Sequence, residues 1–179
     1  MRVFFTGAQG TGKSTLVNKI FTEFPLKRFD SMSRDFMKKR EDQFTDYFQK
    51  RISLHCLNLY VNEEDFVSSR SYFDSIAYPT YSGHKDMVNM VRTYEDMLFE
   101  NDCIYFYIPI EFAISEGGNN LRVIDEKYQK DIDTIIRNEI ENQKILGHLE
   151  EGRNLFTLSG SIEERMEKIR SILKQRMCK

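Results

Sequence analysis

The 179-residue sequence lacks a long hydrophobic segment. Its apolar runs are short, and none approaches the roughly 20 residues that a helix needs to cross a bilayer. The first residues, MRVFFTG, are too short and too soon interrupted for a secretory signal, so we interpret them as the start of a buried strand. From these absences we expect a cytoplasmic protein with no membrane partner.

Cysteine, proline and glycine are also scarce. Cys56, Cys103 and Cys178 are odd in number and far apart, which argues against a disulfide framework or a zinc site and favours a reducing compartment. Three prolines and nine glycines, with 40% hydrophobic and 30% charged residues, are ordinary for a helix-rich globular protein. The length predicts one domain over residues 1–179, as a monomer or a homodimer.

The net charge is only −2, but it is unevenly distributed. Residues 1–51 contain 11 basic and 6 acidic side chains, whereas the rest contains 15 basic and 22 acidic ones. Such an asymmetry can mark the side that meets a polyanion such as DNA. Solvated helix faces explain it equally well, so both interpretations stay open.

Short apolar runs alternate with helical patterns along the chain. We expect strands at residues 3–5, 27–30, 65–68, 103–108 and 154–158. Helical patterns cover residues 16–24, 33–62, 75–100 with a break near 79–83, 128–149, and the segment after a capping box at Ser161 and Glu164. This alternation predicts an α/β protein with a five-stranded parallel sheet and helices on both faces. Ligands of such sheets bind beyond the carboxyl ends of the strands.

One motif carries the clearest chemistry. Its residues are Gly7, Ala8, Gln9, Gly10, Thr11, Gly12, Lys13 and Ser14, and they match the phosphate-binding P-loop pattern G-x-x-x-x-G-K-[ST] between a strand and a helix. Glycines let the backbone turn its N–H groups toward phosphate oxygens, and the helix N-terminus adds positive potential. We therefore predict that the loop binds ATP with Mg²⁺. Lys13 would reach the β- and γ-phosphates, Ser14 would ligate Mg²⁺, and Thr15 would cap the helix or contact the α-phosphate.

The sequence lacks the other motifs of two P-loop classes. Switch GTPases need a D-x-x-G segment and an N-K-x-D base reader, and neither is present. Motor ATPases usually carry an Asp-Glu pair at the end of a strand, but the run 103–108 continues as Pro109, Ile110 and Glu111. These absences count against hydrolysis as the main activity.

The segment after the third expected strand resembles the P-loop nucleoside and nucleotide kinases. Arg70, Ser71, Asp74, Ala77 and Tyr78 match their pattern, in which an acidic residue precedes Arg-Ser, but Ser69 stands where the acid is usual. The similarity is greatest to small kinases grouped with the ribosylnicotinamide kinase domain. These AAA-related proteins include many phage-encoded members, among them phage kinases of hydroxymethyl-pyrimidines in DNA.

The resemblance continues in two further segments. Residues 120–126, including Arg122, look like the lid of these kinases, and we expect a helical lid at about residues 115–130 of a three-layer P-loop kinase fold. Leu158 to Ser161, with Gly160, is similar to their nucleotide-base loop. A lid Arg122 would close over the phosphates and exclude water. Exposure to solvent is its alternative.

Several side chains are predicted to act on the phosphate acceptor. Arg70 would hold an acceptor phosphate or the transferring group, unless it forms a structural ion pair with Asp74 or Asp30. An acceptor hydroxyl needs a nearby carboxylate. Asp30 is predicted as the base or a Mg²⁺ ligand, and Asp74 as the base or a helix cap. Further candidate contacts are Arg34 for the acceptor, and Phe44 and Phe48 with Phe36 and Tyr47 as a wall for a flat base.

The acceptor itself stays open in the sequence. A nucleoside, a nucleotide or a modified nucleotide is our first hypothesis, with 5-hydroxymethyl-pyrimidine in DNA and a ribosylnicotinamide-type substrate as alternatives. An ATP-binding regulator or an ATPase without an acceptor is the alternative from another class.

Overall fold

The computed structural model describes residues 1–29, 45–62, 65–99, 102–112 and 125–178. Five parallel strands form its sheet: β1 (Arg2–Thr6), β2 (Lys27–Phe29), β3 (Phe66–Ser68), β4 (Cys103–Tyr107) and β5 (Leu155–Thr157). Their order is β2-β3-β1-β4-β5. The five-stranded parallel sheet predicted from the sequence is therefore confirmed: four of its strands are apolar runs, and β2 is a short, more exposed strand.

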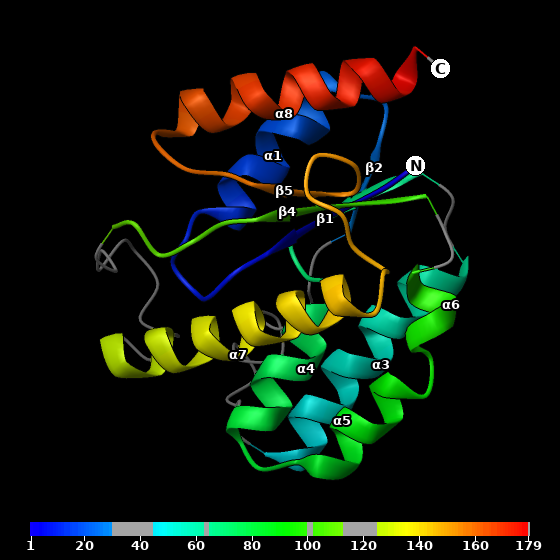
Figure 1. The fold of residues 1–179 in the computed structure, drawn as a ribbon, viewed down its shortest axis with the longest axis vertical. Coiled ribbons are helices and arrows are strands. Elements are labelled where there is room, and N and C mark those ends of the chain that lie inside the picture. The colour runs from blue at the N-terminus through cyan, green and yellow to red at the C-terminus, as the bar shows by residue number, and fades with distance from the viewer. Residues whose placement is uncertain (30–44, 63–64, 100–101, 113–124, 179) are drawn as a thin grey trace.

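Helices cover both faces of this sheet (Figure 1). One layer contains α1 (Lys13–Glu23) and α8 (Ile162–Met177), and the other contains α3 (Asp46–Asn62), α4 (Tyr72–Tyr81), α5 (Lys85–Arg92), α6 (Glu95–Phe99) and α7 (Glu126–Ile145). Alternation along the strands divides the core. Val3 and Phe5 pack with α1 and α8, whereas Phe4 and Tyr105 pack with the opposite layer. This arrangement accounts for the near-continuous apolar strands, since both faces are buried.

The central position of β1 determines where the P-loop lies. Val3 pairs with Val67 of β3 on one side and with Ile104 of β4 on the other. The connection from β1 to α1 therefore leaves the sheet between the carboxyl ends of β3 and β4. This is the edge at which parallel α/β sheets bind ligands.

The helix expected over residues 75–100 consists of three helices. α4 begins earlier than expected, at Tyr72, because Ser71 caps it, and Pro79 lies inside the helix near its end. The break comes at Gly83, whose φ is 77°. α5 and the short α6 then complete the segment.

Apolar side chains recur at helical spacing in residues 33–62 and 128–149, but not all of them are buried. In α3, Tyr47 and Leu54 are 65% and 55% exposed, whereas Phe48 and Ile52 are buried. In α7, Leu146 faces solvent rather than the core, because the helix ends at Ile145 and a turn with Gly147 at φ 82° follows.

The amino end of α7 bears on the predicted lid. α7 begins at Glu126, where Asp125 caps it by accepting hydrogen bonds from the N–H groups of Lys127 and Tyr128. Residues 126–130 of the expected lid are therefore the first turn of α7, and residues 113–124 lie outside the described part of the chain.

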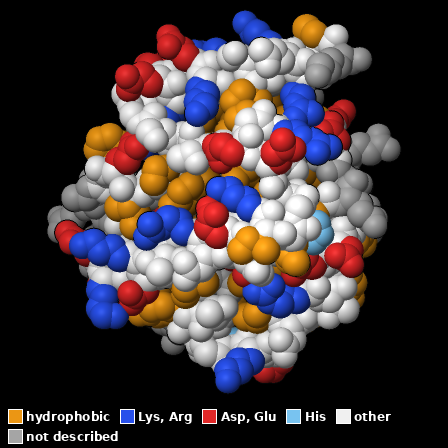
Figure 2. Space-filling model, in the orientation of Figure 1, with side chains coloured by type: hydrophobic (Ala, Val, Ile, Leu, Met, Phe, Trp, Pro, Cys, Tyr) orange, Lys and Arg blue, Asp and Glu red, His pale blue; other side chains and the backbone are white. Residues whose placement is uncertain are grey.

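Two features concern possible partners: the absence of a membrane-spanning helix among the described residues, and the distribution of charge on the surface. Over the described residues, no helix combines the length and apolar character that a membrane span requires. On the face shown in Figure 2, acidic and basic side chains are interspersed, without an extended area of one sign.

Candidate active site

The connection between β1 and α1 is a tight loop whose conformation depends on glycine. Gly7, Gly10 and Gly12 have φ values of 144°, 81° and 93°, which side chains bearing a Cβ rarely adopt. A Cβ on Gly7 would lie 2.4 Å from the carbonyl oxygen of Ile108, just beyond β4. The loop therefore packs directly on the end of the neighbouring strand, at the edge where the sequence predicts it.

Lys13 is the first residue of α1 and folds back over this loop. Its ammonium donates hydrogen bonds to the carbonyl oxygens of Gly7 at 2.5 Å and Ala8 at 2.7 Å. Gly12 precedes the helix as its N-cap and makes no side-chain capping bond. A cation and the positive end of a helix thus converge at one loop, which suits an anion.

The geometry of the loop fits a nucleoside triphosphate accompanied by Mg²⁺. Three of the residues 7–12 are glycines with positive φ, and the Lys13 ammonium contacts the backbone of the loop. Mg²⁺ is commonly held by phosphate oxygens and one or two protein groups. Ser14 is half-buried in the first turn of α1, the position from which a P-loop hydroxyl ligates the ion. Thr15 follows it and is exposed.

Two buried side chains, one from each helical layer, donate hydrogen bonds to carbonyl groups of the loop. The amide of Gln129 in α7 donates to the carbonyl oxygen of Gln9 at 2.6 Å. The guanidinium of Arg165 in α8 donates to the carbonyl oxygen of Thr11 at 2.9 Å. Sequence reasoning missed both residues, because neither contact leaves a local pattern: its partners are more than 100 residues apart.

The segment after β3 brings Arg70 and Asp74 together. Asp74 is buried, and its Oδ2 accepts hydrogen bonds from the backbone N–H and hydroxyl of Ser71 at 3.1 and 3.0 Å and from the hydroxyl of Thr6 at 3.2 Å. The Nη1 of Arg70 lies 3.8 Å from Asp74 Oδ1, and its guanidinium lies 4.4 Å from the centre of the Tyr78 ring. The structure thus makes Asp74 the partner of Ser71 in the capping box of α4, and gives Arg70 the ion pair that the sequence allowed. The catalytic roles of both remain predictions.

A carboxyl group that the sequence did not indicate lies in α7, beside the carboxyl end of β4. Ser69, directly after β3, is a buried residue without a carboxylate, whereas Asp133 of α7 accepts a hydrogen bond from the Tyr107 hydroxyl at 2.8 Å. Burial raises the pKa of Asp133, and this effect is partly offset by Tyr107 and by the positive charges of Arg137 and Lys13. The structure thus adds Asp133 to the charged groups near the carboxyl end of β4.

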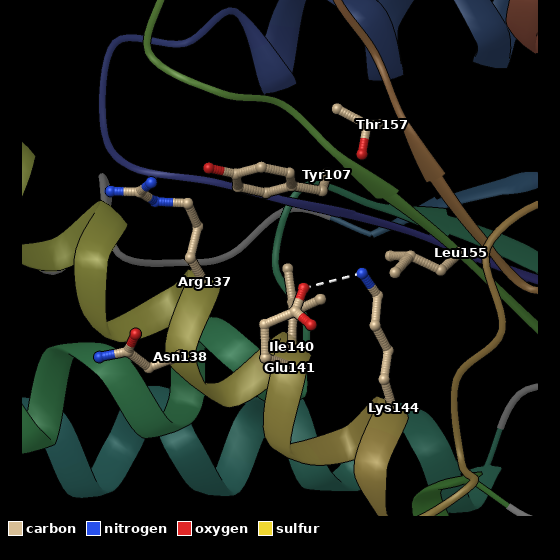
Figure 3. A pocket seen from close by; sticks show the side chains of 8 residues that line it. All are labelled: Tyr107, Arg137, Asn138, Ile140, Glu141, Lys144, Leu155 and Thr157. Carbon is tan, nitrogen blue, oxygen red and sulfur yellow. Dashed lines mark hydrogen bonds and ion pairs between the residues drawn. The ribbon is translucent and has the colours of Figure 1, made fainter.

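A hollow of about 370 Å³ lies between α7 and the strands β4 and β5 (Figure 3). It is lined by Tyr107, Arg137, Asn138, Ile140, Glu141, Lys144, Leu155 and Thr157. Its two cations are already paired, Lys144 with Glu141 at 2.8 Å and Arg137 with Asp133 at 3.1 Å. No residue of the P-loop lines the hollow, so it is separate from the proposed phosphate site.

The loop between β5 and α8 is fixed by a second capping box. Ser161 caps α8, its N–H donates to Glu164 Oε2 at 2.7 Å, and its hydroxyl accepts from the N–H of Glu164. The N–H of Gly160 donates to Glu111 Oε2 at 2.8 Å. The capping box that the sequence predicts is confirmed, and it places Gly160 beside the segment after β4.

Several predicted site residues cannot be placed. Asp30, Arg34, Phe44 and Arg122, as well as Phe36, lie outside the described residues. Phe48 is 4% exposed and packs with Ile52 and Cys56 in α3. Its contact with a base therefore stays a prediction.

The fold and the loop together define the class of the protein. A glycine-rich phosphate loop follows the first, central strand of a five-stranded parallel sheet, which is the α/β fold of P-loop kinases. The sequence pattern of the AAA domain family matches residues 2–165, and the chain belongs to this family. None of the curated proteins matches the chain in sequence.

Solved structures share the fold at low sequence identity. Deoxyadenosine kinase from M. mycoides, with dCMP and dCDP bound, has a TM-score of 0.66 at 14% identity, covering 98% of this chain and 99% of that one. Thymidylate kinase from Candida albicans has a TM-score of 0.66 at 13% identity, with 98% and 92% covered. The NadR protein in complex with NR has a TM-score of 0.72 at 13% identity, covering 97% of this chain and 50% of that one.

Proposed function

We propose that the protein transfers the γ-phosphate of ATP to a nucleoside, a nucleotide or a modified nucleotide. The observation that carries the proposal is the P-loop beside the segment of Arg70, Ser71 and Asp74, on a sheet whose structural relatives include deoxyadenosine and thymidylate kinases. The acceptor oxygen, which is a hydroxyl oxygen of a nucleoside or a phosphate oxygen of a nucleotide, would form a bond to the γ-phosphorus while the bond to the β,γ-bridging oxygen breaks. ADP leaves, and where the acceptor is a hydroxyl its proton passes to a carboxylate or to water.

The roles of the protein in this reaction are positioning and charge stabilisation. Lys13 would leave the carbonyl oxygens of Gly7 and Ala8 for the β- and γ-phosphates. Ser14 would hold Mg²⁺, which neutralises the phosphate oxygens when bound. Arg70 is half-buried at the carboxyl end of β3, from where it would bind the acceptor or the transferring group.

The identity of the base remains part of the proposal. Asp74 Oδ2 already accepts three hydrogen bonds, which suits capping and positioning better than proton transfer. Asp30 follows β2, at the edge where we expect the acceptor, and is the preferred candidate for the base or a Mg²⁺ ligand. Arg122 would act from the lid, as the resemblance implies.

Particular observations bear on two other acceptors. The likeness to the NadR protein in complex with NR supports a ribosylnicotinamide-type substrate. The basic excess of residues 1–51 is compatible with 5-hydroxymethyl-pyrimidine in DNA as an acceptor but does not require it. Both would use the same P-loop and differ only in what approaches Arg70.

The alternative from another class is an ATP-binding regulator or an ATPase without an acceptor. Motor ATPases of the P-loop class use a carboxylate after a strand to activate water. Glu111, the acidic residue that follows β4, is occupied instead, since it accepts hydrogen bonds from Arg165 at 2.7 Å and from Gly160 at 2.8 Å. This engagement favours transfer to an acceptor over hydrolysis.

Transfer of label from γ-labelled ATP tests the proposal. Nucleosides, nucleoside monophosphates, nicotinamide riboside and hydroxymethyl-pyrimidine DNA are offered separately, with Lys13→Ala as the control that should transfer nothing. We expect labelled product with at least one acceptor. Free phosphate from the wild-type protein with no labelled acceptor would refute the kinase proposal, and label on DNA alone would refute the free-nucleotide one.

A further inference from the structure

A buried arginine joins three loops at the carboxyl edge of the sheet. Arg165, in the first turns of α8, is 2% exposed. Its Nη1 donates to the carbonyl oxygen of Thr11 in the P-loop at 2.9 Å, and its Nη2 donates to Glu111 Oε2 at 2.7 Å. Glu111 in turn accepts from Gly160. One ion pair thus connects the phosphate loop, the segment after β4 and the loop before α8.

The contact with Thr11 determines how one peptide of the P-loop is turned. In a trans peptide, the carbonyl of one residue and the N–H of the next point in opposite directions. Arg165 holds the Thr11 carbonyl toward α8, so the N–H of Gly12 faces away from α8. Inward-facing N–H groups are what a P-loop offers to phosphate. Gly12, with φ 93°, permits this turn.

The carboxylate of Glu111 keeps the guanidinium in place. An unpaired buried charge is strongly unfavourable, so Arg165 needs an anion nearby. Burial tends to raise the pKa of Glu111, but hydrogen bonds from Arg165 and Gly160 lower it overall. Glu111 is therefore ionised at neutral pH, and it shares one oxygen between the guanidinium and the N–H of Gly160.

We propose that Arg165 and Glu111 form a positioning pair that orients the Thr11–Gly12 peptide for phosphate binding and couples the P-loop to the loop of Gly160. The proposal rests on the proposed function, because it assigns this pair to the same nucleotide site. Neither residue needs to contact the substrate. A merely structural ion pair would stabilise α8 without changing affinity for phosphate.

Binding of inorganic tripolyphosphate separates these two roles, because this probe has phosphates but no base. Its dissociation constant with Mg²⁺ is measured by calorimetry for the wild type, Arg165→Met and Arg165→Lys, and thermal unfolding is recorded for each without ligand. Arg170→Met is the matched control: Arg170 lies on the same helix and pairs at 2.7 and 2.8 Å with Glu23, the residue at the end of α1 opposite the P-loop.

For Arg165→Met we expect roughly ten- to hundredfold weaker tripolyphosphate binding, the loss for one misdirected charged hydrogen bond. Arg165→Lys should fall between it and the wild type, since a lysine lacks the forked geometry needed to reach both partners. Arg170→Met should bind like the wild type. Weaker binding of ATP should parallel that of tripolyphosphate.

Three results would overturn the proposal. If Arg165→Met folds and binds tripolyphosphate as the wild type does, the pair of Arg165 and Glu111 only stabilises the structure. If only the binding of ATP became weaker, the pair would act on the adenine base of ATP and not on the P-loop. If Arg165→Met does not fold, Glu111→Gln and Arg165→Lys decide, and wild-type affinity in both refutes the idea. A wild-type protein that binds neither ATP nor tripolyphosphate would instead refute the proposed function itself.

Discussion

Replacing Gly7 by alanine should destabilise the protein more than an ordinary glycine substitution. Its φ of 144° is unfavourable for a residue with a Cβ, at a cost of about 1–2 kcal/mol. The new Cβ would also lie 2.4 Å from the carbonyl oxygen of Ile108, a backbone atom that cannot rotate away. Overpacking of this kind costs about 1–3 kcal/mol.

Together these effects predict that Gly7→Ala loses about 2–5 kcal/mol of unfolding free energy. Typical domains have only about 5–15 kcal/mol in total. Gly147→Ala is the matched control, because Gly147 has φ 82° and no atom within 4 Å of the added Cβ. It should lose only the backbone contribution of about 1–2 kcal/mol.

Urea unfolding of the wild type and both variants measures these losses directly, provided the slopes stay equal. The reasoning requires Gly7→Ala to be clearly less stable than Gly147→Ala. Equal losses would refute it, because they would show that the P-loop moves away from β4 at little cost. Gly7→Ala should also weaken ATP binding, since any shift of the loop displaces its N–H groups.

Further predictions concern the charged residues of the site. Lys13→Ala should abolish turnover and leave the thermal unfolding temperature near the wild-type value. Lys19→Ala is the control, and its turnover should stay normal. Wild-type turnover in Lys13→Ala would show that the loop is misinterpreted. Asp30→Asn should cause a large loss of kcat with nucleotide binding preserved, whereas Asp74→Asn should mainly reduce stability. Equal, mild rate losses in the two variants would exclude both residues as the catalytic base. The lowered pKa of Glu111 stabilises the fold above the ordinary glutamate value of roughly 4.3, and this contribution is lost as pH falls through the lowered value. Urea unfolding at several acidic pH values should therefore show a smaller pH dependence for Glu111→Gln than for the wild type, and equal slopes would contradict the assignment.

Local patterns predicted much of this fold because they depend on neighbours in the chain. The run of residues 103–108 is apolar throughout, and every residue of β4 is buried. The capping box of Ser161 and Glu164 places the start of α8, since both partners lie within one turn. Pro79 did not predict the end of its helix accurately, because a proline near the end of a helix need not break it.

Contacts between distant segments could not be predicted in this way. Leu54 and Leu146 look like core residues in the sequence, but neither packs into the described core, and both are more than half exposed. In the sequence, Glu111 only showed that the Asp-Glu pair of motor ATPases is absent. The structure shows that it contacts Arg165 and Gly160. Asp133 carried no motif, yet its pKa is influenced by Lys13.

The sequence by itself determined the P-loop, the alternation of strands and helices, and the parallel sheet, because glycine conformations, caps and hydrophobic periodicity act over a few residues. Only the tertiary structure decided the strand order, the place of Asp74 in the capping box of α4 and the support that Gln129 and Arg165 give to the loop. Those features depend on side chains that meet after the sheet has assembled. The phosphate loop is thus specified locally, whereas the residues that orient it come from helices at the other end of the chain.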